Sequence, residues 1–370
     1  MEQLETEIYL RYKRLVESQK ASSSSRHSSS RYDSCGSPIR TQALVLSNLA
    51  CHSRLRPGIS LNQLSSWKEP KATDRIHDDL AFLCENAQPR SVTLPEIIDR
   101  YDAFCFDGYG TLYNRGSFVY PGAMEWFQAL RRAGKYIRLV TNAASDVDDV
   151  LARDADKRGF DFTAAETISS GSLLKELVAE LRGYGHEMRE VYYIGRETGK
   201  NVLASCGMHA VAMDADPAEP IVAISSAKDT PETYAQAVKI LQRPGAILLV
   251  LNSDAWAPKI PDENGLTVRE PVSGALSEHL RRDSISVTNP AGAETYYLGK
   301  PFPAIWNKVK CSLSAGSRVL MIGDTLGTDV YGAKVAGFDS ALVVGRNEPV
   351  EELKKDELTL GIRPDYYLKS

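Results

Sequence analysis

Two acidic turns, far apart in the chain, hold the residues whose types and spacing are best suited to chemistry. Asp107 ends an apolar segment, Ala-Phe-Cys-Phe, and is followed at once by a glycine-containing turn. Asp324 and Asp329 follow a second apolar segment, Val-Leu-Met-Ile, in the same way. Open α/β sheets place their chemistry at the carboxyl ends of parallel strands, so we expect the two turns to share one site.

Two further strand ends lie between these turns and complete a plausible reaction site. Thr141 ends the expected strand that contains Arg-Leu-Val, and Lys300 follows Tyr-Tyr-Leu-Gly. An aspartate attacks phosphorus only when its repulsion with the phosphoryl oxygens is relieved. Asp107 and Asp324 offer oxygen ligands that suit Mg²⁺. Lys300 would neutralise the aspartate and phosphate oxygens, and the Thr141 hydroxyl would donate a hydrogen bond to a phosphoryl oxygen.

The elements that position these residues alternate between strand and helix, which predicts parallel βαβ units and an α/β fold. The expected strands of the main unit are 101–107, 136–141, 166–168, 318–322, 339–344 and one near the C-terminus, and its helices are 122–133, 146–158, 302–312 and 328–336. A second α/β unit carries strands 190–194, 220–225 and 246–251 and helix 230–242. We therefore predict a core of residues 93–172 and 294–370, with helices on both faces of its sheet, interrupted by an insertion, 173–293.

Residues 1–92 are expected to form an N-terminal extension. Its segment 22–37 contains nine serines and is too polar to bury a core, which favours disorder. Helical spacing within 8–16 and 74–86 predicts two short helices, which could dock on the core or mediate assembly. A homo-oligomer is one alternative, and an appendage without a specific partner is the other.

Composition excludes several classes of function. The chain of 370 residues has 44 basic and 48 acidic residues, a net charge of -4, which gives no footprint for nucleic acid or an anionic membrane. No apolar stretch approaches the length of a membrane-spanning helix. The acidic start lacks the apolar region of a secretory signal, so we expect a cytoplasmic protein. The six cysteines show neither disulfide nor zinc spacing.

The motifs resemble those of the haloacid dehalogenase (HAD) superfamily, specifically class IIA, the relatives of the bacterial NagD phosphatase. The matching segments are Tyr120-Pro-Gly-Ala, Val140-Thr-Asn142, Leu251-Asn-Ser-Asp254, Gly274-Ala-Leu276, Gly299-Lys-Pro-Phe-Pro303 and Gly323-Asp-Thr-Leu-Gly-Thr-Asp329. The resemblance runs from about Tyr101 to Leu368. It implies a Rossmann-like core, an inserted C2-type cap domain, Mg²⁺ dependence and a small phosphorylated substrate.

The resemblance also implies a role for each matching residue. Asp107 would form an aspartyl-phosphate and bind metal with Asp324, and Asp329 would support that metal through its waters. Lys300 would bridge the nucleophile and the phosphate. The remaining matched residues would contact the substrate, and these are Thr141, Asn142, Asn252 and Asp254.

One position departs from the family pattern. The first motif is usually Asp-x-Asp, and its second aspartate protonates the leaving oxygen and then activates water, but here that position is Tyr109. Loss of such acid–base help costs roughly 10²–10⁴ in rate. Tyr109 can donate a proton but is a poor base near neutrality, while its backbone carbonyl is still expected to bind metal. Two alternatives to a phosphatase stay open: a catalytically weak binding or regulatory protein, and a carbon–halogen or carbon–phosphorus hydrolase.

Overall fold

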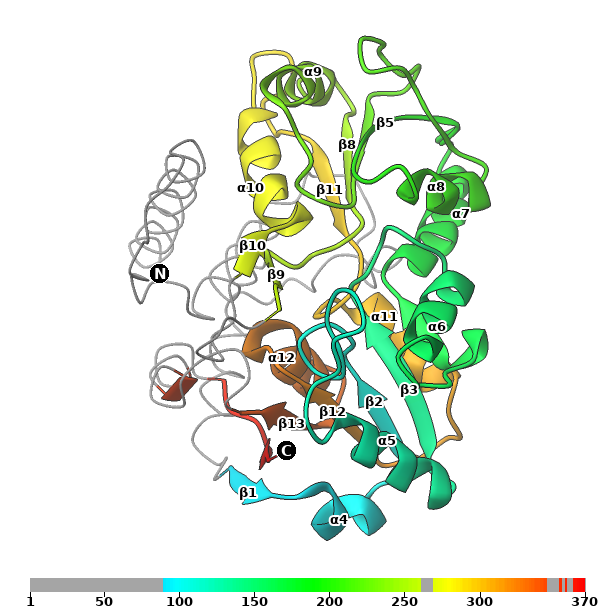
Figure 1. Ribbon diagram of the computed structural model, residues 1–370. Helices are drawn as coiled ribbons and strands as arrows, with labels where there is room; N and C mark the ends of the chain where they lie inside the picture. Colours follow the sequence, from blue (N-terminus) through cyan, green and yellow to red (C-terminus); the bar gives the residue numbers. More distant parts are fainter. Residues whose placement is uncertain (1–88, 261–268, 345–352, 355–356, 358–361, 370) are drawn as a thin grey trace.

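The computed structural model describes residues 89–260, 269–344, 353–354, 357 and 362–369. Two parallel sheets dominate this part of the chain, a seven-stranded sheet in the lower half of Figure 1 and a five-stranded sheet in the upper half. The serine-rich segment and the two helices expected before residue 88 lie outside the described residues. No helix in the described part is both long and apolar enough to cross a membrane.

The seven-stranded sheet brings the two acidic turns together. In spatial order its strands are β1 (Arg90–Val92), β14 (Tyr366–Leu368), β13 (Asp339–Val343), β12 (Val319–Gly323), β2 (Ala103–Phe106), β3 (Tyr136–Thr141) and β4 (Thr167–Ser169). All neighbouring pairs are parallel. Because β2 and β12 are adjacent, with Phe106 opposite Ile322, the residues that follow them emerge side by side at one edge.

Both faces of this sheet are buried, which confirms the predicted α/β fold. Phe104 and Phe106 of β2 pack with Phe127 in one apolar cluster, and Cys105 packs in a second cluster on the opposite face. Full burial of each phenylalanine stabilises the fold by roughly 1.5–3 kcal/mol. The helices of this part are α4 (Leu94–Ile97), α5 (Ala123–Arg132), α6 (Asp148–Asp156), α11 (Pro303–Cys311) and α12 (Tyr331–Val335).

The five-stranded sheet belongs to the inserted part of the chain. Its strands, in spatial order, are β11 (Glu294–Tyr297), β8 (Ile247–Val250), β7 (Ile221–Ile224), β5 (Glu190–Ile194) and β6 (His209–Ala210). Its helices are α7 (Leu174–Gly183), α8 (Gly199–Ser205), α9 (Pro231–Leu241) and α10 (Ser273–Asp283). A small antiparallel pair, β9 (Trp256–Pro258) and β10 (Arg269–Pro271), projects toward the core. One apolar cluster runs continuously from the core sheet to this sheet, so the two parts share buried surface.

Three details differ from the sequence-based expectations. β1 pairs with β14, so residues 90–92 join the core sheet although we placed them in the extension. β11 pairs with β8, so the strand at the start of the predicted second core segment completes the inserted sheet instead. The expected helix 328–336 begins with a π-helical turn, Leu326–Val330, before α12. The two strand departures depend on tertiary pairing, which short segments do not encode locally.

Candidate active site

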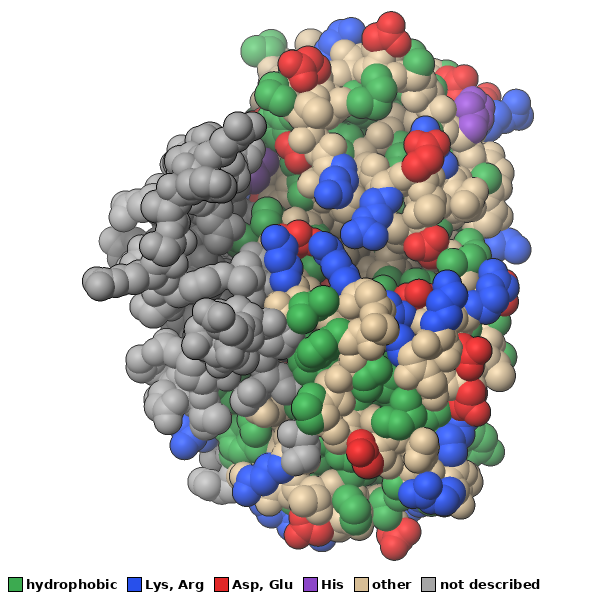
Figure 2. All heavy atoms as spheres, viewed as in Figure 1, with side chains coloured by type: hydrophobic (Ala, Val, Ile, Leu, Met, Phe, Trp, Pro, Cys, Tyr) green, Lys and Arg blue, Asp and Glu red, His purple; other side chains and the backbone are tan. Residues whose placement is uncertain are grey.

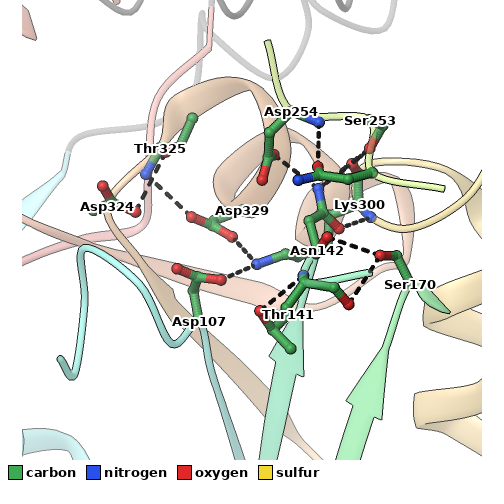
Figure 3. Close-up of polar contacts among 12 residues, drawn as sticks. Asp107, Thr141, Asn142, Ser170, Ser253, Asp254, Lys300, Asp324, Thr325 and Asp329 are labelled. Carbon is green, nitrogen blue, oxygen red and sulfur yellow. Dashed lines mark hydrogen bonds and ion pairs between the residues drawn. The ribbon is translucent and has the colours of Figure 1, made fainter. Parts of the chain in front are cut away.

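Asp107 and Lys300 form the centre of the site. Asp107 directly follows β2, and Lys300 lies three residues beyond β11, so the core sheet provides the carboxylate and the inserted sheet the amine. Lys300 Nζ donates to Asp107 Oδ1 at 2.6 Å and to Asp329 Oδ1 at 2.7 Å (Figure 3). The Lys300 side chain is buried, as are both carboxylates. A buried charge needs such pairing, and Lys300 is therefore fixed between two acids.

Three carboxylates form an acidic cluster that fits a divalent cation. Oxygen atoms of Asp107, Asp324 and Asp329 all lie within 4.8 Å of one another. Asp329 reaches this position because residue 323 is glycine: a Cβ there would lie 2.2 Å from Asp329 Cγ. The Asp329 carboxylate is also held by the backbone N–H of Thr325, which donates to Oδ2 at 3.1 Å. These hard oxygen donors suit Mg²⁺, and the predicted carbonyl ligand of Tyr109 stays a prediction.

Burial and crowding perturb the ionisation of this cluster. Burial raises the pKa of Asp107 to about 7; Lys300 acts in the opposite direction, while the nearby carboxylates of Asp329 and Asp324 add to the increase. Burial alone would lower the pKa of Lys300, but the surrounding carboxylates raise it above its usual value. The lysine is therefore charged, and the site favours further positive charge near Asp107.

Asn142 ties the core to the insertion. Its Nδ2 donates to Asp254 Oδ1 at 2.8 Å and to the Lys300 carbonyl at 2.9 Å, and its Oδ1 accepts from the Lys300 N–H at 2.7 Å. Ser253 Oγ donates to the same carbonyl at 2.5 Å. This close approach requires Gly299, whose φ is +95° and whose Cβ would lie 2.3 Å from Asn142 Oδ1. Asn142 therefore positions Lys300 and Asp254.

A small cavity of about 30 Å³ opens at the acidic cluster, between the two parts of the chain. Its lining residues are Asp107, Tyr109, Asp254, Trp256, Pro258, Lys300, Asp324, Thr325, Thr328 and Asp329. The sequence-based expectations missed four of these, Trp256, Pro258, Thr325 and Thr328. Trp256 and Pro258 belong to β9, and only their nearness to the Leu-Asn-Ser-Asp motif could have indicated them.

Tyr109 lines the cavity, but its hydroxyl is engaged elsewhere. That hydroxyl lies 3.5 Å from Asp154 Oδ2 of α6, and Asp154 is paired with Arg158 at 2.7 Å. The ring packs edge-on against Tyr113, with centroids 5.2 Å apart. Burial, followed by the negative charge of Asp154, raises the pKa of Tyr109. A higher pKa makes this phenol a weaker acid, so the structure adds no support for Tyr109 as the proton donor.

Three predicted substrate ligands do not line the cavity, and these are Thr141, Asn142 and Asn252. Thr141 is buried at the end of β3, where its Oγ1 accepts from the Ala143 N–H at 3.2 Å. Asn252 makes a turn in which its Oδ1 accepts from the Asp254 N–H at 2.8 Å. Their predicted contacts with substrate stay predictions, whereas Asp254, from the same motif, does line the cavity. The turn at Asn252 therefore fixes the position of the Asp254 backbone.

Comparison with known proteins identifies the family. Residues 104–209 match a family described as haloacid dehalogenase-like hydrolase, and residues 297–370 match a related family described as HAD-hydrolase-like. Chronophin of Mus musculus is 27% identical over 292 residues, which cover 76% of this chain and 94% of that protein.

Solved structures agree with this relationship. A possible sugar phosphatase of the HAD superfamily from Cytophaga hutchinsonii shares the fold with a TM-score of 0.63 at 22% identity, covering 76% of this chain and 98% of its own. The glycerol phosphate phosphatase of Mycobacterium tuberculosis, in complex with magnesium, has a TM-score of 0.52 at 25% identity, covering 67% of this chain and 69% of its own. The two family matches, together with the alignment to chronophin, therefore identify the chain as a member of the haloacid dehalogenase-like hydrolases.

Proposed function

We propose that this protein is a Mg²⁺-dependent phosphatase that hydrolyses a small phosphate monoester through an aspartyl-phosphate on Asp107. The observation that carries the proposal is the placement of Asp107 in the cavity, with Lys300 Nζ at 2.6 Å and two further carboxylates beside it. Asp107, Asp324 and Asp329 would hold the cation, which when bound neutralises charge on phosphoryl oxygens. Lys300 orients Asp107 and offsets its repulsion with the substrate.

Basic side chains whose charge reaches one wall of the cavity favour an anionic substrate. The charge of Arg196, from the insertion, acts on both Arg115 of the core and Tyr109, and Tyr109 lines the cavity. Figure 2 shows Lys and Arg side chains (blue) on the viewed face at the level where the insertion meets the core. Basic side chains near a site raise the local concentration of anionic ligands, and the cation held by the acidic cluster would offset the negative charge inside the cavity. The relatives named as phosphatases agree with this class of substrate.

Asp107→Asn tests the proposal. With 4-nitrophenyl phosphate and Mg²⁺, we expect wild-type turnover, its loss after EDTA treatment, and its recovery on adding Mg²⁺. Loss of a covalent nucleophile costs on the order of 10⁶ in kcat, so Asp107→Asn should be essentially inactive. Turnover that survives in the variant or in EDTA would contradict the proposal. Tight Mg²⁺ binding without any turnover would instead favour the alternative of a catalytically weak binding protein.

A further inference from the structure

The proposed phosphatase reaction, on which this inference rests, needs a group that moves protons. A poor leaving group must be protonated as its bond to phosphorus breaks, and water must lose a proton as it attacks the aspartyl-phosphate. Tyr109 occupies the position where a carboxylate would do both, and its hydroxyl lies against Asp154. Another group must therefore carry the proton if the enzyme turns over poor leaving groups.

One carboxylate that lines the cavity lies outside the acidic cluster and could carry the proton. Among the described residues, four aspartates line it, and three of them, Asp107, Asp324 and Asp329, make up the acidic cluster. The fourth is Asp254, which enters from the loop after β8 of the insertion. It lies outside the acidic cluster, and in the described part of the chain Lys300 forms its ion pairs with Asp107 and Asp329.

The orientation of Asp254 suits a proton carrier. Its Oδ1 accepts from Asn142 Nδ2 at 2.8 Å, which fixes the side chain, and its other oxygen points toward the space above Asp329 and Lys300 (Figure 3). We propose that Asp254 is a catalytic residue that serves as general acid and then general base, in place of the carboxylate absent at position 109. The insertion would thus complete the reaction machinery as well as cover it.

The two steps balance with one shuttled proton. In the first, an Asp107 oxygen bonds to phosphorus, the bond from phosphorus to the leaving oxygen breaks, and that oxygen takes the proton of Asp254. In the second, Asp254 takes a proton from water, the water oxygen bonds to phosphorus, and the bond from phosphorus to Asp107 breaks. Alcohol and phosphate leave, and both aspartates return to their starting forms.

The surroundings of Asp254 agree with this role. The charged groups that act on it are Lys300, Asp107 and Asp329. Burial raises the pKa of Asp254 to about 7, while Lys300 and the hydrogen bond from Asn142 act in the opposite direction. A general acid–base group works best with a pKa near the operating pH, because both of its forms are then accessible.

Asp254→Asn in the full chain, assayed with two substrates, tests the proposal. Asparagine keeps an oxygen for the Asn142 hydrogen bond but cannot carry the proton. Nitrophenolate leaves without a proton, so kcat/KM for 4-nitrophenyl phosphate should fall less than about tenfold. Phenyl phosphate needs the proton, so its kcat/KM should fall roughly 10²–10⁴-fold. Because hydrolysis of the aspartyl-phosphate also slows, rapid mixing with 4-nitrophenyl phosphate should give a burst near one equivalent per site, which also shows that the site is folded.

Two controls separate the outcomes. Asp216→Asn changes an aspartate of the same insertion that pairs with Lys239 outside the cavity, and both substrates should be unaffected. Tyr109→Phe should change kcat/KM for both substrates by the same factor. Equal losses on both substrates in Asp254→Asn, no loss at all, or leaving-group dependence in Tyr109→Phe instead would overturn the assignment. Absence of any Asp107-dependent release of nitrophenolate from wild type would refute the proposed function itself.

Discussion

The core sheet and the inserted sheet both border the cavity with the ends of parallel strands, but they hold their functional residues in different ways. In each, two adjacent parallel strands end at the site: β2 and β12 in the core, β8 and β11 in the insertion. Asp107 and Asp324 follow their core strands directly, whereas Asp254 and Lys300 lie four and three residues beyond theirs. The core therefore fixes its carboxylates by strand geometry, while the insertion relies on loop conformation and on contacts made across to the core.

The core and the insertion therefore contribute different charged groups to the site. The core supplies a compact set of negative charges, and the insertion supplies the lysine that balances them and the remaining carboxylate. Asn142 holds both insertion residues from the core side. We infer that the site is complete only when the two sheets are held together, and changes at the contacts between them should reveal how strongly each part depends on the other.

Removing the lysine should have the largest effect. Lys300→Met leaves the buried carboxylates of Asp107 and Asp329 without their shared cation. Breaking a buried pair in this way costs about 3–5 kcal/mol of unfolding free energy at neutral pH. Loss of a charged group at the phosphate should also lower kcat/KM by roughly 10²–10³.

Denaturant unfolding in EDTA measures the stability part of this prediction. Lys239→Met is the matched control, because Lys239 is an exposed lysine of the insertion paired with Asp216 and its loss should cost less than about 1 kcal/mol. A destabilisation by Lys300→Met no greater than that of the control would mean that the acidic cluster does not depend on the insertion for its charge balance.

A pH-dependent effect of intermediate size should appear at Asp254. Its folded-state pKa, about 7, lies above the ordinary carboxyl value, so folding favours the protonated form. This contribution is full below about pH 4 and is lost as pH rises toward 7, to an upper bound of about 4 kcal/mol. Asp254→Asn cannot titrate. In EDTA its unfolding free energy relative to wild type should therefore rise between pH 4 and pH 7, and a constant difference across this range would contradict the assigned environment.

The smallest effect is expected at the exposed contact between the two regions. Arg115 of the core pairs with Glu270 of β10, and Asn114 Nδ2 donates to the Lys259 carbonyl at 3.0 Å. Partly exposed ion pairs contribute about 0.2–1 kcal/mol, so a double-mutant cycle of Arg115→Ala and Glu270→Gln should give a coupling energy in that range. Coupling above about 2 kcal/mol would show that this rim contact, and not the buried contacts, holds the insertion in place.

The sequence predicted the site residues of the core better than those of the insertion, and the reason is physical. Strands such as β2 and β12 are buried on both faces, so they read as apolar runs, and the acids that follow them stand out. The positions of Asp107, Asp324 and Asp329 around one cavity could therefore be predicted. The three-residue strand β1 carries too little pattern, and its pairing depends on β14, far away in the chain.

The functional meaning of the insertion could be predicted only in part. The Asn-Ser-Asp motif identified Asp254 as a candidate, and an Asn-x-Asp sequence at a strand end is itself typical of the turn that Asn252 makes. The sequence does not show that Asp254 lines the cavity with the acidic cluster while Asn252 does not. The contact of the Tyr109 hydroxyl with Asp154 likewise depends on the packing of α6. Such relations arise from how loops are placed by the rest of the fold, and loop sequences do not encode them legibly.

The proposed division of roles between Asp107 and Asp254 is tested most directly by locating the phosphoryl group on the enzyme during turnover. Wild type, Asp254→Asn and the double variant Asp107→Asn, Asp254→Asn would be mixed with 4-nitrophenyl phosphate and Mg²⁺, quenched in acid within the burst, and analysed by intact and peptide mass spectrometry. We predict close to one phosphoryl group per chain on Asp107 in Asp254→Asn, a smaller fraction in wild type, and none in the double variant. A phosphoryl group on another residue, or continued turnover with none on the enzyme, would contradict the central claim that Asp107 carries the phosphoryl group while the insertion completes the site.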